Sequence, residues 1–125
     1  MDESIVVTGL NELVRGCHQA SIDGGWWHDL NTGEKLKRDP GMLIALLHSE
    51  LSEMLEAIRK DLMDDKLTHR KGVEVEAADV LIRLCDFCGA NDLDLAGALV
   101  EKMNFNRVRE DHKPENRRLA NGKAF

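Results

Sequence analysis

Pairs of carboxylates with the spacing of one helical turn occur in two segments of the chain. Glu50 and Glu53 are three residues apart in HSELSEMLEAIRK, and Glu76 and Asp79 are three residues apart in VEAADVLIR. Residues at this spacing share a helix face, so each pair points in one direction if its segment is helical. If the two helices pack antiparallel, all four carboxylates converge.

Four partly buried carboxylates repel one another and lose hydration, so they need compensating cations. Mg²⁺ binds oxygen ligands and commonly works with carboxylates and substrate phosphates, and water bound to a metal is a better nucleophile. The two pairs therefore predict a divalent-cation site. The alternative for any one pair is an ordinary solvated helix face, which is our interpretation of Glu56, Glu74 and Glu101.

Two other metals can be weighed against magnesium. A ferritin-like di-iron site needs Glu-x-x-His, and none of the five histidines has a glutamate three positions before it. Cys85 and Cys88 form a C-x-x-C, which can bind zinc, but they lie in an apolar helix stripe and no second pair exists. We expect them to be buried thiols.

Phosphate-binding side chains are predicted in LVEKMNFNRVR, where Lys102, Asn106 and Arg109 form one helical stripe. A lysine, an amide and an arginine are suitable donors to phosphate oxygens. The alternative is an exposed basic helix end that complements the helix dipole. The polar segment that follows has two possible interpretations. It is either a lid, which adds Lys123 to the phosphate contacts, or a disordered tail.

Four helices must position these side chains. Hydrophobic periodicity and capping signals predict helices over residues 4–23, 40–63 and 73–88, and a fourth from a cap at Asp92 or Asp94 to residue 109. A long loop joins the first two helices and contains Trp26 and Trp27. We predict an all-α fold, a four-helix bundle, as one domain of residues 1–125 with a helical core at about 4–109 and a basic C-terminal tail at 110–125.

The composition describes a soluble globular protein, with 42% hydrophobic and 32% charged residues in 125 positions. The net charge of −6 divides into about +4 for residues 102–125 and −10 for the rest. An acidic body argues against nucleic-acid binding and suits cations there with an anion near the tail. No apolar run could span a membrane, MDESIVVTGL is not a signal peptide, and three cysteines form no disulfide framework. We expect a cytoplasmic protein.

The motifs together resemble the MazG-like, all-α nucleoside triphosphate pyrophosphohydrolases. The resemblance covers about residues 40–113 and depends on LLHSELSEMLEAI, VEAADVLIRLCDFCGANDLDL and EKMNFNRVRED. Its basis is the ordered Glu-x-x-Glu and Glu-x-x-Asp pair, followed by the Lys, Asn and Arg set. The ending ANGKAF is similar to small single-domain members of the phage type. Many members have a second acid directly before the first motif, where this chain has Ser49.

The resemblance implies hydrolysis of a (deoxy)nucleoside triphosphate to the monophosphate and pyrophosphate. It implies two or three Mg²⁺ ions, replaceable by Mn²⁺, and a homodimer or homotetramer in the cytoplasm, which is the host's cytoplasm if a phage encodes the chain. The residues implied as catalytic metal ligands are Glu50, Glu53, Glu76 and Asp79. The residues implied as phosphate contacts are Lys102, Asn106 and Arg109.

Base recognition is expected outside the metal motif. Indoles stack on bases, so Trp26 and Trp27 are candidates, although either could equally be a core or interface residue. Asn31 could read a base edge or the ribose. The base stays open between a purine deoxynucleotide, dGTP or dATP, and dCTP or dUTP. The alternative function is a non-catalytic helical module for oligomerisation or regulation.

Overall fold

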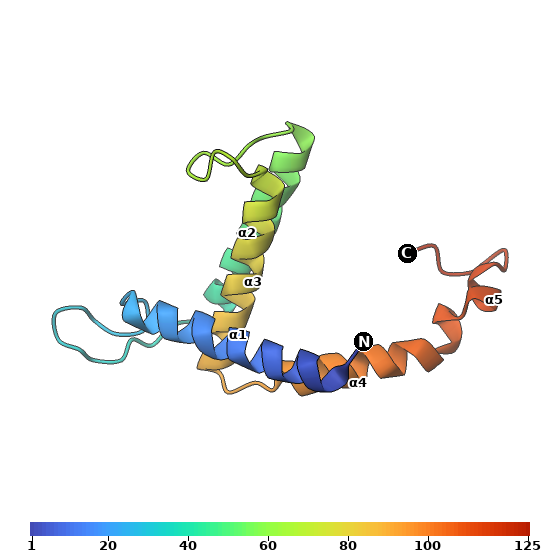
Figure 1. Cartoon of the computed structure of the whole chain (residues 1–125), viewed down its shortest axis with the longest axis horizontal. Coiled ribbons are helices and arrows are strands. Elements are labelled where there is room, and N and C mark those ends of the chain that lie inside the picture. Colours follow the sequence, from blue (N-terminus) through green and yellow to red (C-terminus); the bar gives the residue numbers. More distant parts are fainter. The chain divides into compact units, whose positions relative to one another are not determined.

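The computed structural model describes residues 1–125, and it is all-helical. The five α-helices are α1 (Glu3–Asp23), α2 (Pro40–Arg59), α3 (Gly72–Ala90), α4 (Leu95–Val108) and α5 (Pro114–Arg117), with a 3₁₀ turn, η1 (Glu110–His112), before α5 (Figure 1). No β-strand is present, which confirms the all-α prediction. None of the helices has the length and apolar character that a membrane crossing requires.

The helix ends follow the capping residues. Asp39 caps α2, because its Oδ1 accepts from the Gly41 N–H at 2.7 Å, and Pro40 starts the helix as predicted. Of the two residues left open for α4, Asp94 is the cap: its Oδ1 accepts from the Gly97 N–H at 2.9 Å. Helix α2 ends at Arg59, before the expected residue 63, and Asp61 has a positive φ of 48° just beyond it.

The chain divides into two compact units. Unit 1 comprises residues 1–11 and 94–125, and unit 2 comprises residues 12–93, so α1 contributes residues to both. The single-domain bundle stays a prediction, and each unit is described by itself. The segment expected to be a lid or a disordered tail contains η1 and α5.

Unit 2 is built on a hairpin of α2 and α3, which pack side by side and antiparallel (Figure 1). Two small residues let the helices approach closely. A Cβ added to Gly72 would lie 3.1 Å from the Ala57 Cβ, and Ala57 is itself buried. The antiparallel packing that the carboxylate hypothesis requires is therefore present.

The end of α1 packs on α3 through another small residue. A Cβ added to Gly89 would lie only 2.6 Å from the Cβ of His18. Cys85 and Cys88 are buried free thiols, as expected. Burial is the main cause that raises the pKa of Cys85 to about 11, and burial also raises the pKa of Cys88. These thiols are therefore packing residues rather than reactive groups.

Unit 1 combines the first turns of α1 with α4 and the C-terminal segment. The side-chain amide of Asn104 donates to Glu3 Oε1 at 2.9 Å, and Ala96 is completely buried. Helix α4 leads through η1 into α5 (Figure 1). This unit contains the basic stripe predicted for phosphate.

Candidate functional site

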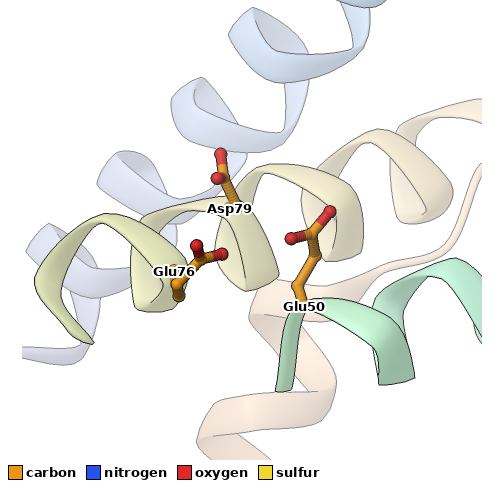
Figure 2. Close-up of side chains that lie close together, drawn as sticks. All are labelled: Glu50, Glu76 and Asp79. Atoms are coloured by element: carbon orange, nitrogen blue, oxygen red, sulfur yellow. The ribbon is translucent and has the colours of Figure 1, made fainter. Parts of the chain in front are cut away.

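Three carboxylates converge between α2 and α3 (Figure 2). Glu50 projects from α2, and Glu76 and Asp79 project from α3. One carboxylate oxygen of each lies within 4.8 Å of the others, and all three residues are partly buried. We call these three residues the carboxylate cluster. Oxygen ligands at these separations can bind one hard divalent cation.

Glu53, the fourth expected ligand, lies outside the carboxylate cluster and is exposed. A helix turns about 100° per residue, so a side chain three positions further on is rotated by about 60° from Glu50. Glu53 still raises the pKa of Glu76 slightly, as the smallest of several causes, so it is a neighbour of the cluster. Its role as a metal ligand stays a prediction.

The carboxylate cluster is short of positive charge. Burial raises the pKa of Glu76 most, followed by the charges of Glu50 and Asp79. Burial also raises the pKa of Asp79, followed by the charge of Glu50, while Arg83 opposes this shift. Raised carboxyl pKa values mean that the charged forms are disfavoured here, and a bound cation would remove that penalty.

Arg83 is the cation already at the cluster. Its Nε donates to Glu50 Oε1 at 2.6 Å, from α3 to α2. Arg83 was not among the predicted site residues, although its spacing is a signal: it follows Asp79 by four residues, so the two share a face of α3. Arg83 therefore neutralises part of the cluster's charge in the absence of another cation.

A cavity of about 610 Å³ adjoins the carboxylate cluster and shares two of its residues. Its volume lies in the range of sites for small organic ligands. The lining combines carboxylates, arginines, an indole and apolar side chains: Cys17, Ala20, Ser21, Trp26, Arg38, Leu46, Glu50, Asp79, Ile82, Arg83 and Asp86. This composition provides an apolar surface and both signs of charge within one pocket.

The two tryptophans have different roles in unit 2. Trp26 lines the cavity and is 64% exposed, whereas Trp27 is 7% exposed and belongs to the core. Trp27 also has the guanidinium of Arg38 5.0 Å from its ring. Asn31 is exposed and does not line the cavity, and its backbone N–H donates to Asp29 Oδ1 at 2.9 Å. Stacking on a base is therefore available to Trp26.

Asp86 organises the wall of the cavity, and it too was absent from the predicted site residues. Its carboxylate accepts from Trp27 Nε1 at 2.9 Å and from Ser21 Oγ at 2.8 Å, and it lies 2.8 Å from His18 Nδ1. The available signal was an acid directly after Cys85, inside the apolar stripe of α3. A partly buried acid needs such partners, and here they tie α1 and the tryptophan loop to α3.

The predicted phosphate contacts belong to unit 1. The cationic groups of Lys102 and Arg109 lie 5.2 Å and 5.9 Å from the centre of the Phe105 ring. Asn106 Oδ1 is buried without a hydrogen-bond partner. Lys123 lies 4.0 Å from Asp111 in the C-terminal segment. The expected meeting of this stripe with the carboxylate cluster, which belongs to unit 2, stays a prediction.

Comparisons of the chain with protein-family models, with curated proteins and with solved structures gave no match. The resemblance to the MazG-like family therefore depends on the quoted motifs alone. A function has to be argued from the carboxylate cluster and the cavity beside it.

Proposed function

We propose that this protein hydrolyses a (deoxy)nucleoside triphosphate to the monophosphate and pyrophosphate. The observation that supports it best is that Glu50 and Asp79 belong both to a cluster of three carboxylates and to the lining of a nucleotide-sized cavity. The ordered motifs that resemble the MazG-like family give the reaction class. On this proposal the helices assemble as the bundle of that family.

The cluster fits Mg²⁺, because its ligands are all carboxylate oxygens and burial disfavours their charged forms. Glu50, Glu76 and Asp79, with Glu53 beside them as the fourth expected ligand, would hold the ions, which are expected to number two or three, and Mn²⁺ could replace them. A bound ion supplies polarisation of phosphoryl oxygens and a lowered pKa of coordinated water.

The reaction itself needs a nucleophilic water, a group that accepts its proton and donors that bind the phosphates. A water attacks the α-phosphorus, and the bond between this phosphorus and the bridging oxygen of the leaving pyrophosphate breaks. Glu53, exposed beside the cluster, can accept the proton of the water. Lys102, Asn106, Arg109 and Lys123 would bind phosphate oxygens as donors, which is mainly positioning and neutralisation of charge.

Base recognition in this proposal depends on the indole of Trp26, which is exposed and lines the cavity. Trp27 acts indirectly, because Asp86 fixes its ring in the core. Trp26→Ala is expected to raise KM for the preferred nucleotide with a smaller effect on kcat. Leu30→Ala, at an exposed residue of the same loop that does not line the cavity, is the control.

An uncovered apolar stripe on α2 supports a homodimer or homotetramer. Ile44, Leu51, Leu55 and Ile58 lie on one face of α2, and their exposures run from 37% to 59%. A contiguous apolar helix face in water favours association. Leu55→Glu is expected to shift the mass in analytical ultracentrifugation towards the monomer, whereas Leu30→Glu in the exposed loop is not.

The same stripe favours the second candidate, a non-catalytic oligomerisation or regulatory module. The deciding experiment supplies all eight common ribo- and deoxynucleoside triphosphates with Mg²⁺ and separates the products. We expect pyrophosphate release that Glu50→Gln and Asp79→Asn abolish while helicity is kept. Glu56→Gln, which removes a charge paired with Lys60 just after the end of α2, should retain turnover. Turnover of none of the eight, or normal pyrophosphate release by Glu50→Gln and Asp79→Asn, contradicts the proposal.

A further inference from the structure

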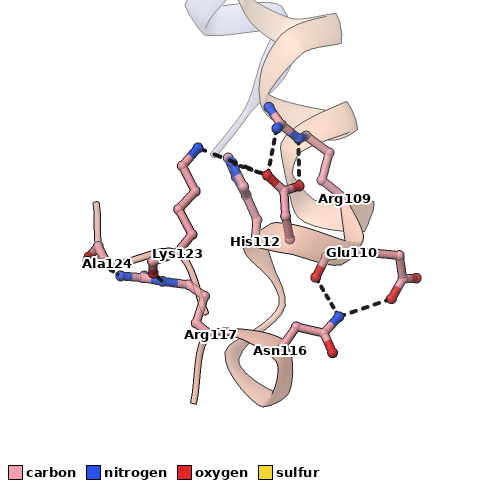
Figure 3. Close-up of polar contacts among 8 residues, drawn as sticks. Arg109, Glu110, His112, Asn116, Arg117, Lys123 and Ala124 are labelled. Carbon is pink, nitrogen blue, oxygen red and sulfur yellow. Dashed lines mark hydrogen bonds and ion pairs between the residues drawn. The ribbon is translucent and has the colours of Figure 1, made fainter. Parts of the chain in front are cut away.

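Three basic side chains of the C-terminal segment surround a single carboxylate (Figure 3). Arg109 donates from Nε to Asp111 Oδ1 at 3.0 Å and from Nη2 to Oδ2 at 2.8 Å. The Nε2 of His112 and the Nζ of Lys123 lie 3.8 Å and 4.0 Å from Oδ2. The hydrogen bonds from Arg109 hold the pKa of Asp111 below its ordinary value, so Asp111 is anionic at neutral pH. It is the shared counter-ion of Arg109 and Lys123, and of His112 when that imidazole is protonated.

The backbone after α5 turns back and closes this arrangement. Arg117 donates from Nε to the Lys123 carbonyl at 3.2 Å and from Nη2 to the Ala124 carbonyl at 3.0 Å (Figure 3). Gly122 permits the turn, since a Cβ there would collide with the Arg117 carbonyl oxygen. We call residues 109–124 the C-terminal hook.

The hook forms an open surface pocket of about 460 Å³, and the basic side chains in its lining are His112, Arg117, Arg118 and Lys123. The Arg117 guanidinium meets only neutral carbonyl oxygens. The Arg118 backbone N–H donates to the Pro114 carbonyl at 3.1 Å, but the Arg118 side chain makes no hydrogen bond or ion pair. Lys113 differs, because Glu110 pairs with it at 2.5 Å. No carboxylate side chain lines the pocket, so its positive charge is only partly neutralised, by Asp111 beside it.

We propose that the C-terminal hook binds a phosphate or diphosphate group, and that Asp111 is a built-in competitor for its cations. Guanidinium groups bind phosphate oxygens in pairs and an ammonium adds a point charge, so this set of side chains suits such an anion. A diphosphate offers more charge and more acceptor oxygens than one carboxylate does. It would therefore displace Asp111 from Arg109 and Lys123.

The hook shares Arg109 and Lys123 with the proposed function and deepens their assignment, but anion binding there needs neither the carboxylate cluster nor hydrolysis. The hook would bind the phosphate end of the ligand. The affinity would depend on Asp111, because its carboxylate competes with the ligand for the same basic side chains. An acid that weakens ligand binding is the distinguishing feature of the proposal.

The test is calorimetric titration of the full chain with inorganic pyrophosphate, in chelator and without divalent metal. Asp111→Asn is expected to bind roughly threefold to tenfold more tightly than the unaltered chain, because the competitor is lost. Glu115→Gln is the matched control, since it changes the net charge equally and Glu115 has no ion pair in the hook. Its affinity should change less than about twofold, because exposed charges beyond contact are screened.

Two further variants separate a built site from general basicity. Arg118→Gln removes an unpaired cation, and Gly122→Ala disturbs the turn without changing any charge; both should weaken binding at least about threefold. Circular dichroism of each variant checks that the helices are kept. The proposal is overturned if Asp111→Asn binds no more tightly than Glu115→Gln, or if Gly122→Ala and Arg118→Gln both bind like the unaltered chain.

Further titrations distinguish the source of the phosphate and the fate of the two proposals. Tighter binding of a nucleoside triphosphate than of pyrophosphate assigns the hook to a nucleotide, and equal or weaker binding assigns it to the free anion; sulfate binding as tight as pyrophosphate contradicts both. The same titrations in Glu50→Gln should be unchanged. Pyrophosphate binding without hydrolysis of any nucleotide would contradict the proposed function and support anion binding by the hook. Nucleotide hydrolysis without pyrophosphate binding would contradict anion binding by the hook and support the proposed function.

Discussion

Arg83 Nε donates to Glu50 Oε1 at 2.6 Å, so an arginine of α3 is bonded to the one glutamate that α2 contributes to the carboxylate cluster. The Glu50 side chain is only 15% exposed, which makes this pair less screened than a surface ion pair. In the metal-free protein, Arg83 does part of what a divalent cation would do there. A cation and Arg83 would therefore compete for Glu50.

Arg83→Gln is expected to lower the metal-free midpoint of thermal unfolding by a few degrees, since an ion pair of this kind contributes roughly 0.5–1 kcal/mol. The same variant should show a larger rise in midpoint on addition of Mg²⁺ or Mn²⁺, because Glu50 is released to the ion and metal binds only the folded state. Differential scanning fluorimetry with a metal series measures both effects. Arg59→Gln, at an exposed residue of α2 paired with Glu56, is the control; an equal metal response in the two variants would contradict competition.

Glu76 and Asp79 should make the metal-free protein more stable to unfolding as the pH falls below neutral. Their pKa values in the folded chain lie above the ordinary values of 4.5 and 3.8, first because of burial. A carboxyl with a raised folded pKa binds its proton more tightly when folded. Its ionisation therefore destabilises the metal-free protein at neutral pH, and this loss is recovered as pH falls through the raised pKa.

Glu76→Gln is accordingly expected to raise the metal-free unfolding midpoint at neutral pH by a few degrees. Between neutral pH and a pH just above 4.5, the midpoint of the variant relative to that of the unaltered chain should fall, as the latter recovers the stability lost to ionisation. Thermal melts in chelator at several pH values measure this. Glu101→Gln, an exposed α4 residue, corrects for general charge effects; a pH-independent difference between Glu76→Gln and the unaltered chain would refute the sign.

Asp86→Ala should cost about 2–3 kcal/mol of unfolding free energy. The variant leaves Trp27 Nε1, Ser21 Oγ and His18 without their shared acceptor in a partly buried place. Asp86→Asn, which keeps the shape and one acceptor oxygen, is expected to lose less. Denaturant titration followed by tryptophan fluorescence gives both values, and a loss for Asp86→Ala no larger than that for Asp86→Asn would argue against the shared-acceptor role.

Gly89→Ala should destabilise the protein by about 1–3 kcal/mol, because its methyl group would lie 2.6 Å from the Cβ of His18 and force α1 away from α3. Gly16→Ala is a matched change in the middle of α1, where an added Cβ meets nothing within 4 Å. It should stabilise the protein by about 0.5–1 kcal/mol through helix propensity alone. Denaturant midpoints test the opposite signs, and a neutral Gly89→Ala would show that the helices tolerate separation there.

The helices were predictable because their signals are local. Apolar spacing and Gly24-Gly25 predicted the two ends of α1 to within one residue. Asp39-Pro40 predicted the first residue of α2. The choice of Asp94 over Asp92 as the cap of α4 was not predictable, since both are acids at the end of a break and only the backbone conformation separates them.

The sequence by itself determined the all-α fold and the candidate ligands, because a helix fixes which residues share a face. The tertiary structure decided which of those faces meet. Close packing of Ala57 on Gly72 joins α2 and α3 at a rotation that brings Glu50 to Glu76 and Asp79 and leaves Glu53 exposed. The tertiary structure also brings Arg83 to Glu50 and Trp27 to Asp86, and the members of these pairs are 33 and 59 residues apart in the sequence. No local pattern encodes such pairs, since they depend on how two helix surfaces fit together.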